Sequence, residues 1–315
     1  MRCVPQKDKL MVVLTCKLPN SAPMSDRKPL WLVLAPMIFL LLWAGGYTVA
    51  KIGLRHAPPM TLLAIRFGFV VLIMGILFLI MRPPLPKTWV EWGHLAFVGV
   101  MIQTVYFGLN YLGFVNGIPA GTSALIMSMQ PIAVAFIAPR WAGEHVGLVQ
   151  WFGLVLALIG SAVVILARMN VGPTPLVGYV FTTVGMFGMV AGTLWEKRFG
   201  LSHHPVTANL IGYGAGLICL LPFLLLEDVT DVQWTWSFVG ALAYLVIGNS
   251  VIAIGLLLAM VRAGEVSKVS AQLFLVPPVA AIMAWFVLGE EMPFWAWLGF
   301  GFAGAGVYLA THKRV

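Results

Sequence analysis

The chain has 315 residues, of which 60% are hydrophobic and only 10% are charged. A soluble domain carries roughly a quarter charged residues, so this composition excludes an ordinary water-soluble protein. The formal net charge of +8 is spread over short segments between apolar runs, which favours orientation in a bilayer over binding of nucleic acid. We therefore predict an all-α integral membrane protein whose main partner is the lipid bilayer.

Residues 1–29 form a polar N-terminal tail that contains one short apolar patch, Leu10–Leu14. This patch is too short for a signal-peptide core or for a membrane span. Met24 stands just before basic residues and the first long apolar run. We therefore predict that the native chain begins at Met24 and that residues 1–23 are an upstream extension.

Ten apolar runs follow, each bounded by proline, glycine or charged residues. A spanning helix needs about 20 apolar residues, so ten spans fill this chain and leave only short connections. The runs predict transmembrane helices at residues 31–50, 59–80, 90–112, 119–139, 148–167, 176–195, 205–226, 237–258, 266–288 and 294–311.

The lysines and arginines near the ends of these spans fix a predicted orientation, because basic residues accumulate on the cytoplasmic side. With a cytoplasmic N-terminus, only Lys51, Arg55 and Arg168 fall outside. The inside set is Arg27, Lys28, Arg82, Lys87, Arg140, Lys197, Arg198, Arg262, Lys268, Lys313 and Arg314. Both termini are predicted to be cytoplasmic, in a multi-pass protein of the plasma (inner) membrane.

The sequence repeats itself at a shift of 146 residues, which aligns Gly46 with Gly192 and Lys51 with Lys197. The third predicted helix aligns with the eighth at a shift of 147. Each copy has five spans, an odd number, so the second copy is expected to lie upside-down relative to the first. Inverted repeats of this kind are a transporter architecture. The predicted units are residues 30–168 and 174–312.

Three segments resemble the EamA branch of the drug/metabolite transporter superfamily. They are WAGGYTVAKIGLRHAPPMTLLAIRF (43–67), the run from Ala120 through Pro131 to Gly143-Glu144, and its repeat from Ser267 through Pro277 to Gly289-Glu290. The resemblance covers residues 31–311. It implies ten helices in two inverted halves around a central cavity, and transport, often export, of amino acids or other metabolites. Smaller relatives couple export to protons through a glutamate in the middle of the first helix, which this chain lacks in 31–50 and in the interior of 176–195.

Polar residues inside the predicted spans are candidates for the cavity wall. Arg66 lies about 12 Å inside the second helix, where an ionisable residue is a functional candidate, although it could also cap carbonyls of a neighbouring helix. Gln103, Tyr106 and Asn110 are spaced to share one face of the third helix. The eighth helix offers Asn249 and Ser250. Hydrogen bonding between helices is the alternative explanation for these amides.

Aromatic and proline residues add further candidates. Trp43 and Tyr47 flank a glycine pair and could form the wall of an apolar pocket, with simple packing as the alternative. Pro131 and Pro277 interrupt equivalent helices, and matched interruptions point to a binding site. The polar neighbours of these prolines are Ser128, Gln130 and Gln272.

The sequence therefore predicts a secondary transporter that moves small metabolites, such as amino acids, by alternating access. A multidrug, sugar, nucleotide-sugar or lipid-linked carrier of the same fold is the alternative, and a membrane-embedded enzyme or a receptor is a more distant one. The spans show no carboxylate–histidine pairing and no phosphate-binding loop, so no catalytic residue, metal or cofactor is predicted. Three GxxxG motifs, beginning at Gly113, Gly188 and Gly212, leave open whether they pack within the chain or in a homodimer.

Overall fold

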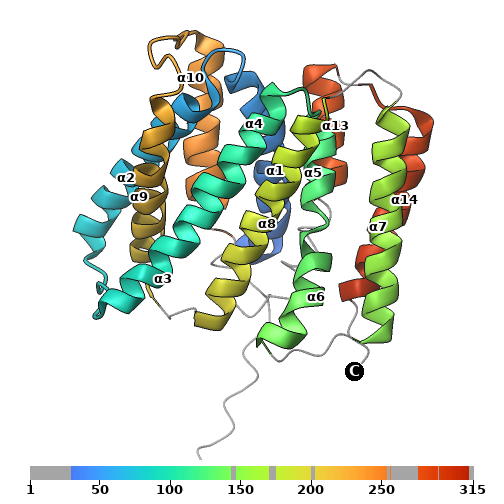
Figure 1. Ribbon diagram of the computed structural model, residues 1–315, viewed down its shortest axis with the longest axis horizontal. Helices are drawn as coiled ribbons and strands as arrows, with labels where there is room; N and C mark the ends of the chain where they lie inside the picture. Colours follow the sequence, from blue (N-terminus) through green and yellow to red (C-terminus); the bar gives the residue numbers. More distant parts are fainter. Residues whose placement is uncertain are drawn as a thin grey trace, which may run out of the picture. The chain divides into compact units, whose positions relative to one another are not determined.

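The computed structural model describes residues 30–142, 147–169, 175–199, 203–253, 256, 276–289 and 291–311, and these are helical with no strand among them (Figure 1). The chain divides into two units, Met1–Leu34 and Ala35–Val315, and the contacts below lie within the second unit. The helices are α1 (Leu30–Gly53), α2 (Pro59–Met81), α3 (Trp89–Gly99), η1 (Val100–Gly108), α4 (Leu109–Val115), α5 (Ala120–Met127), α6 (Gln130–Ala142), α7 (Leu148–Met169), α8 (Leu176–Phe199), α9 (Pro205–Leu224), α10 (Trp236–Ala243), η2 (Tyr244–Ala253), α13 (Val276–Leu288) and α14 (Phe294–Thr311).

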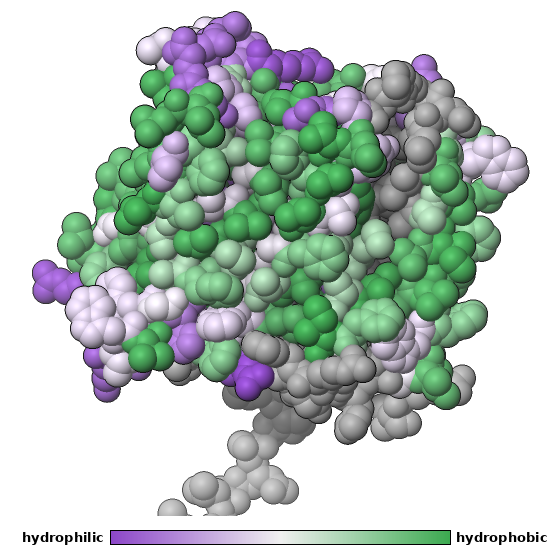
Figure 2. Space-filling model, in the orientation of Figure 1, coloured by the Kyte–Doolittle hydropathy of each residue, from purple (hydrophilic) through white to green (hydrophobic). Residues whose placement is uncertain are grey.

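Six helical stretches of the described chain are long and apolar enough to cross a bilayer. They are Leu34–Gly53, Pro59–Met81, Trp89–Val115, Leu176–Glu196, Pro205–Leu224 and Trp236–Ala253. Shorter apolar helices cover Leu148–Gly160 and Phe294–Ala310. Large hydrophobic side chains are exposed along these helices, whereas hydrophilic residues gather towards the helix ends on the face in Figure 2. The prediction of an all-helical membrane protein is confirmed.

The two ends of the helices are named here by the first two connections of the chain. The Arg55 end is where α1 passes into α2, and the Lys87 end is where α2 passes into α3. At the Arg55 end, Glu227 from the segment after α9 accepts hydrogen bonds from the backbone N–H groups of Met60 and Thr61 at 3.0 and 2.9 Å. A carboxylate at this place satisfies free N–H groups of the first turn of α2 and faces the positive end of its dipole.

Two stretches, η1 and η2, are π-helices, whose hydrogen bonds reach five residues back instead of four. The shift of 147 that aligns the third predicted span with the eighth moves η1 onto residues 247–255, so most of η1 coincides with η2. A π-helix is rare and is frequent at functional sites. The candidates Gln103 and Tyr106 lie in η1, and Asn249 and Ser250 lie in η2. The two copies therefore carry the same irregularity where the sequence places their polar residues.

The predicted span 119–139 is interrupted, because α5 ends at Met127 and α6 begins at Gln130. Pro131 lies in the first turn of α6, where its missing N–H costs least. The interruption expected near Pro131 is confirmed. In the second copy, Pro277 lies in α13, which is described from Val276 onwards. Residues 257–275, including the candidate Gln272, lie outside the described residues.

Helices α7 and α14 pack against each other through glycines. A Cβ atom on Gly160 would lie 2.6 Å from the carbonyl oxygen of Gly299, and one on Gly306 would lie 2.6 Å from that of Gly153. Higher numbers on α7 meet lower numbers on α14, so the two helices are antiparallel. In the alignment at a shift of 146, Gly153 is equivalent to Gly299 and Gly306 is equivalent to Gly160, so the two contacts are the same contact with the copies exchanged. Equivalent places in the two copies therefore make the same contact.

The GxxxG glycines also lie at contacts within the chain. Gly188 and Gly192 of α8 face Val105 and Ile102 of η1, and Gly216 of α9 faces Gln103. Small residues at such contacts allow membrane helices to approach closely. These glycines thus bring helices of the second copy against η1 of the first.

Candidate functional site

A cavity of about 330 Å³ lies between α1, α3, η1, α5, α6, α8 and α13, and we call it the wide cavity. This volume falls within the range of small-molecule sites, which are mostly apolar with a few polar groups. Its apolar wall includes Trp43, Ile102 and Met189. The polar side chains in its wall are Tyr47, Tyr106, Ser128, Gln130, Thr193 and Glu196. Glu196 is exposed near the end of α8, so the wide cavity extends towards the Lys87 end.

A second cavity of about 20 Å³ lies nearer the Arg55 end and is lined by Arg66, Ala50 and Asn110 among others. We call it the Arg66 chamber. A cavity of this volume holds about one water molecule. Trp43, Tyr47 and Tyr106 line both cavities and therefore form a wall between them.

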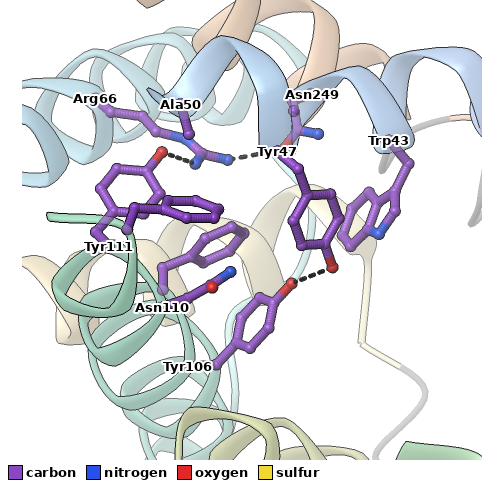
Figure 3. A pocket seen from close by; sticks show the side chains of 11 residues that line it. Trp43, Tyr47, Ala50, Arg66, Tyr106, Asn110, Tyr111 and Asn249 are labelled. Carbon is purple, nitrogen blue, oxygen red and sulfur yellow. Dashed lines mark hydrogen bonds between the residues drawn. The ribbon is translucent and has the colours of Figure 1, made fainter. Parts of the chain in front are cut away.

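Tyr47 and Tyr106 are the polar part of this wall. Their hydroxyl oxygens are 3.2 Å apart and share a hydrogen bond, drawn as a dashed line in Figure 3. Tyr47 comes from α1 and Tyr106 from η1, and both side chains are buried. The bond therefore joins two helices at the boundary of a cavity large enough for a small metabolite.

Arg66 is 1% exposed and donates to three neutral side chains. Its Nη1 donates to the Tyr111 hydroxyl at 3.1 Å, and its Nη2 donates to Asn249 Oδ1 at 2.8 Å (Figure 3). Both Nε and Nη2 also donate to Ser250 Oγ, at 3.2 and 3.0 Å. The guanidinium carbon also lies 4.5 Å from the centre of the Phe107 ring. These partners orient the guanidinium group without neutralising its charge.

Gly45 and Gly46 allow α1 to lie close to η2 beside this site. A Cβ atom on Gly46 would lie 2.6 Å from Asn249 Nδ2, so a larger residue would displace the Asn249 side chain. The Asn249 amide and the Tyr244 hydroxyl both donate to the carbonyl of Leu42, at 3.2 and 3.1 Å. These bonds fix the position of α1 and, with it, Trp43 and Tyr47.

The structure brings most of the candidate residues together. Trp43, Tyr47 and Tyr106 lie between the cavities, Arg66, Asn110 and Asn249 line the Arg66 chamber, Ser250 binds Arg66, and Ser128 and Gln130 line the wide cavity. Gln103 does not line either cavity and packs against Gly216 of α9. A π-helix has more residues per turn than an α-helix, so a spacing of three residues covers a smaller part of a turn. Gln103 and Tyr106 of η1 therefore no longer share a face.

Sequence reasoning missed three polar residues of this site. Tyr111 was passed over because it lies beside the expected stripe, and it becomes a partner of Arg66. Thr193 lies inside the expected sixth span but was not singled out as a polar candidate. Glu196 was missed because that span was expected to end at residue 195, whereas α8 continues to Phe199. The predicted span ended at Trp195 because charged residues follow it. Charged residues mark where a helix leaves the apolar layer, but they do not show whether the helix itself ends there or continues into solvent.

Comparison with known proteins adds independent information. The sequence model of the EamA-like transporter family matches residues 29–166 and again residues 176–311. A protein of Salmonella typhimurium named as a probable amino-acid metabolite efflux pump is 27% identical over 284 residues, covering 87% of this chain and 92% of its own length. YvbV of Bacillus subtilis, an uncharacterized transporter, is 27% identical over 262 residues, covering 80% of this chain and 82% of its own.

Two further likenesses agree with these. YedA of Escherichia coli, described as an inner membrane transporter, is 23% identical over 278 residues, covering 86% of this chain and 87% of its own length. One crystal structure of a protein superposes with a TM-score of 0.63 at 18% identity, covering 90% of this chain and 97% of that one. This last likeness concerns the fold alone.

Proposed function

Because this chain belongs to the EamA-like transporter family, we propose that it carries small amphipathic metabolites, amino acids or related compounds, across the inner membrane by alternating access. The family and the named relatives are transporters or efflux pumps, not enzymes. The observation that carries the proposal is the wide cavity of about 330 Å³, which is separated from the Arg66 chamber by Trp43, Tyr47 and Tyr106.

Alternating access requires two halves that can exchange roles, and the proposed arrangement is ten spans in two inverted repeats. The reciprocal glycine contacts of the antiparallel helices α7 and α14 support it, because equivalent places in the two copies meet. The overlapping π-helices η1 and η2 support the same relationship. The proposal needs no second copy of the chain, since the wide cavity is lined by residues of one chain.

The proposed direction is export from the cytoplasm. The charge distribution favours a cytoplasmic Lys87 end, and the wide cavity extends towards that end, so substrate would load from the cytoplasm. The Salmonella typhimurium relative is named as an efflux pump, which supports the same direction. Mixed polar and apolar walls suit an amphipathic molecule, and Glu196 offers a partner for an ammonium group near the entrance.

Counterflow in proteoliposomes tests this proposal. Vesicles loaded with unlabelled L-leucine or L-phenylalanine should accumulate the labelled amino acid, whereas vesicles loaded with glucose or ethidium should not. Repeating the assay with and without a pH gradient reports on coupling. Accumulation of glucose or ethidium but of neither amino acid would contradict the proposed substrate class and favour a sugar or multidrug carrier.

The tyrosine wall gives a separate prediction. Tyr106→Phe keeps the ring and removes a hydrogen bond with a net value of about 1 kcal/mol, so the wall should open about five times more often. Ala50 lines the Arg66 chamber. An Ala50→Cys side chain reports this opening through its rate of modification by a small thiol reagent, with the native Cys3, Cys16 and Cys219 replaced by serine. Tyr179→Phe on α8, away from both cavities, is the matched control. Equal rates in the two backgrounds would show that the tyrosine bond is not a barrier.

A further inference from the structure

We propose that the Arg66 chamber is an anion subsite that receives the carboxylate group of the transported substrate. This inference deepens the proposed transport function and depends on it. It assigns to Arg66 the selection of metabolites that carry a carboxylate.

The first argument is charge. Arg66 is buried, and its hydrogen-bond acceptors are two hydroxyl groups and one amide, all neutral. No carboxylate is among the acceptors described for Arg66, and Glu227, at the Arg55 end, caps α2 instead. A buried cation without a counter-charge is costly, and an anion that reaches it recovers part of that cost. The site therefore favours a negatively charged group.

The second argument is the supply of donors beside an open space. A guanidinium group has five N–H donors, and the described bonds of Arg66 use four of them, which leaves one N–H on Nη1. Asn110 Oδ1 accepts from the Ser123 hydroxyl, so its amide nitrogen is left to donate. Both residues line the Arg66 chamber (Figure 3). Such donors match a carboxylate oxygen.

The third argument is size. The chamber, at about 20 Å³, admits one small polar group and not a whole metabolite. The wide cavity, on the other side of the wall formed by Trp43, Tyr47 and Tyr106, has the volume for the rest of the substrate. A substrate with its carboxylate at Arg66 would therefore extend past Tyr47 and Tyr106, and the wall has to part for this to happen. Binding at Arg66 is thereby coupled to opening of the wall.

The fourth argument comes from the repeat. The shift of 146 places Gly212 of α9 where the first copy has Arg66. There, a Cβ atom on Gly99 of α3 would overlap the backbone of Gly212, so the two helices pack backbone to backbone. The duplicated architecture thus does not need an arginine at this place. Only the first copy carries an arginine at this place, as expected of a residue that serves a ligand site and not the repeated fold.

The test compares L-leucine with L-leucinamide, which lacks the carboxylate, through the ligand-induced rise in melting temperature of the purified protein and through competition in counterflow. L-leucine should bind at least tenfold more tightly than L-leucinamide. In Arg66→Gln this difference should fall to less than twofold, and Arg66→Lys should keep most of it because the positive charge remains. Arg198→Gln, which removes a cation stacked on Phe199 of α8, is the control and should keep the full difference.

Several outcomes would overturn the inference. If the unaltered protein bound L-leucine and L-leucinamide equally well, the inference would be overturned, whether or not Arg66→Gln folds. A response to replacement of chloride by gluconate that is lost in Arg66→Gln, without discrimination between the probes, would assign the chamber to an inorganic anion instead. Absence of counterflow with every solute would remove the proposed function, whereas the melting measurement would still show whether Arg66 selects carboxylates.

Discussion

Gly160→Ala and Gly306→Ala are expected to destabilise the protein by similar amounts, about 1–3 kcal/mol each. The added methyl group on either residue would overlap the backbone of the facing helix, at Ala303 for Gly160 and at Ala157 for Gly306. Backbone atoms cannot rotate away as a side chain can, so α7 and α14 have to separate. The two substitutions make the same contact in exchanged copies, and their costs should therefore match.

The control for this pair is Gly301→Ala on α14, where a Cβ atom would meet nothing within 4 Å. Alanine is favoured over glycine in a helix by up to about 1 kcal/mol, so this change should be neutral or stabilising. The measurement is the midpoint of unfolding, followed by circular dichroism, in a denaturant titration of the detergent-solubilised protein. If all three variants unfolded at the same midpoint, α7 and α14 would not be packed through these glycines.

Glu227→Ala should lower the free energy of unfolding by about 1–2 kcal/mol, the range measured for loss of a helix cap. The carboxylate accepts three hydrogen bonds at the start of α2, from the backbone of Met60 and from the backbone and hydroxyl of Thr61. It also faces the positive end of the helix dipole. Glu227→Gln should cost less, because the amide retains one acceptor oxygen.

Asp228→Asn is the matched control for Glu227. Its carboxylate is exposed and, among the described residues, accepts only from Thr230 of the same loop. Its effect should stay within about 0.5 kcal/mol, as for most surface substitutions. Equal losses in Glu227→Ala and Asp228→Asn, measured by the same denaturant titration, would contradict the capping role and indicate a general effect of loop charge.

The coarse architecture could be predicted from the sequence because lipid imposes a simple requirement. A helix in hydrocarbon needs a long apolar run, and such runs remain visible without any knowledge of packing. The stretches Pro59–Met81 and Pro205–Leu224 are confirmed within a few residues for this reason. The repeat was visible because glycines and prolines have few substitutes where helices cross closely or bend.

The finer features of the site could not be predicted because they depend on contacts between distant residues. Nothing in the local sequence of Val100–Gly108 distinguishes a π-helix from an α-helix, so the face occupied by Gln103 was not foreseeable. Arg66 was recognisable as a buried charge, but its partners Asn249 and Ser250 lie more than 180 residues away. The separation of two cavities by a pair of tyrosines required the positions of α1 and η1.

The inverted relationship of the two copies is the central claim, and labelling of matched loops tests it most directly. Lys87 and Trp234 are equivalent at the shift of 147, and both are exposed. Single Lys87→Cys and Trp234→Cys variants, made without the native cysteines, should react with a membrane-impermeant thiol reagent from opposite sides of sealed, oriented vesicles. We expect position 234 to react only from the outer side of the membrane and position 87 only from the cytoplasmic side. Reaction of both positions from the same side would contradict the inverted duplication and the alternating-access proposal built on it.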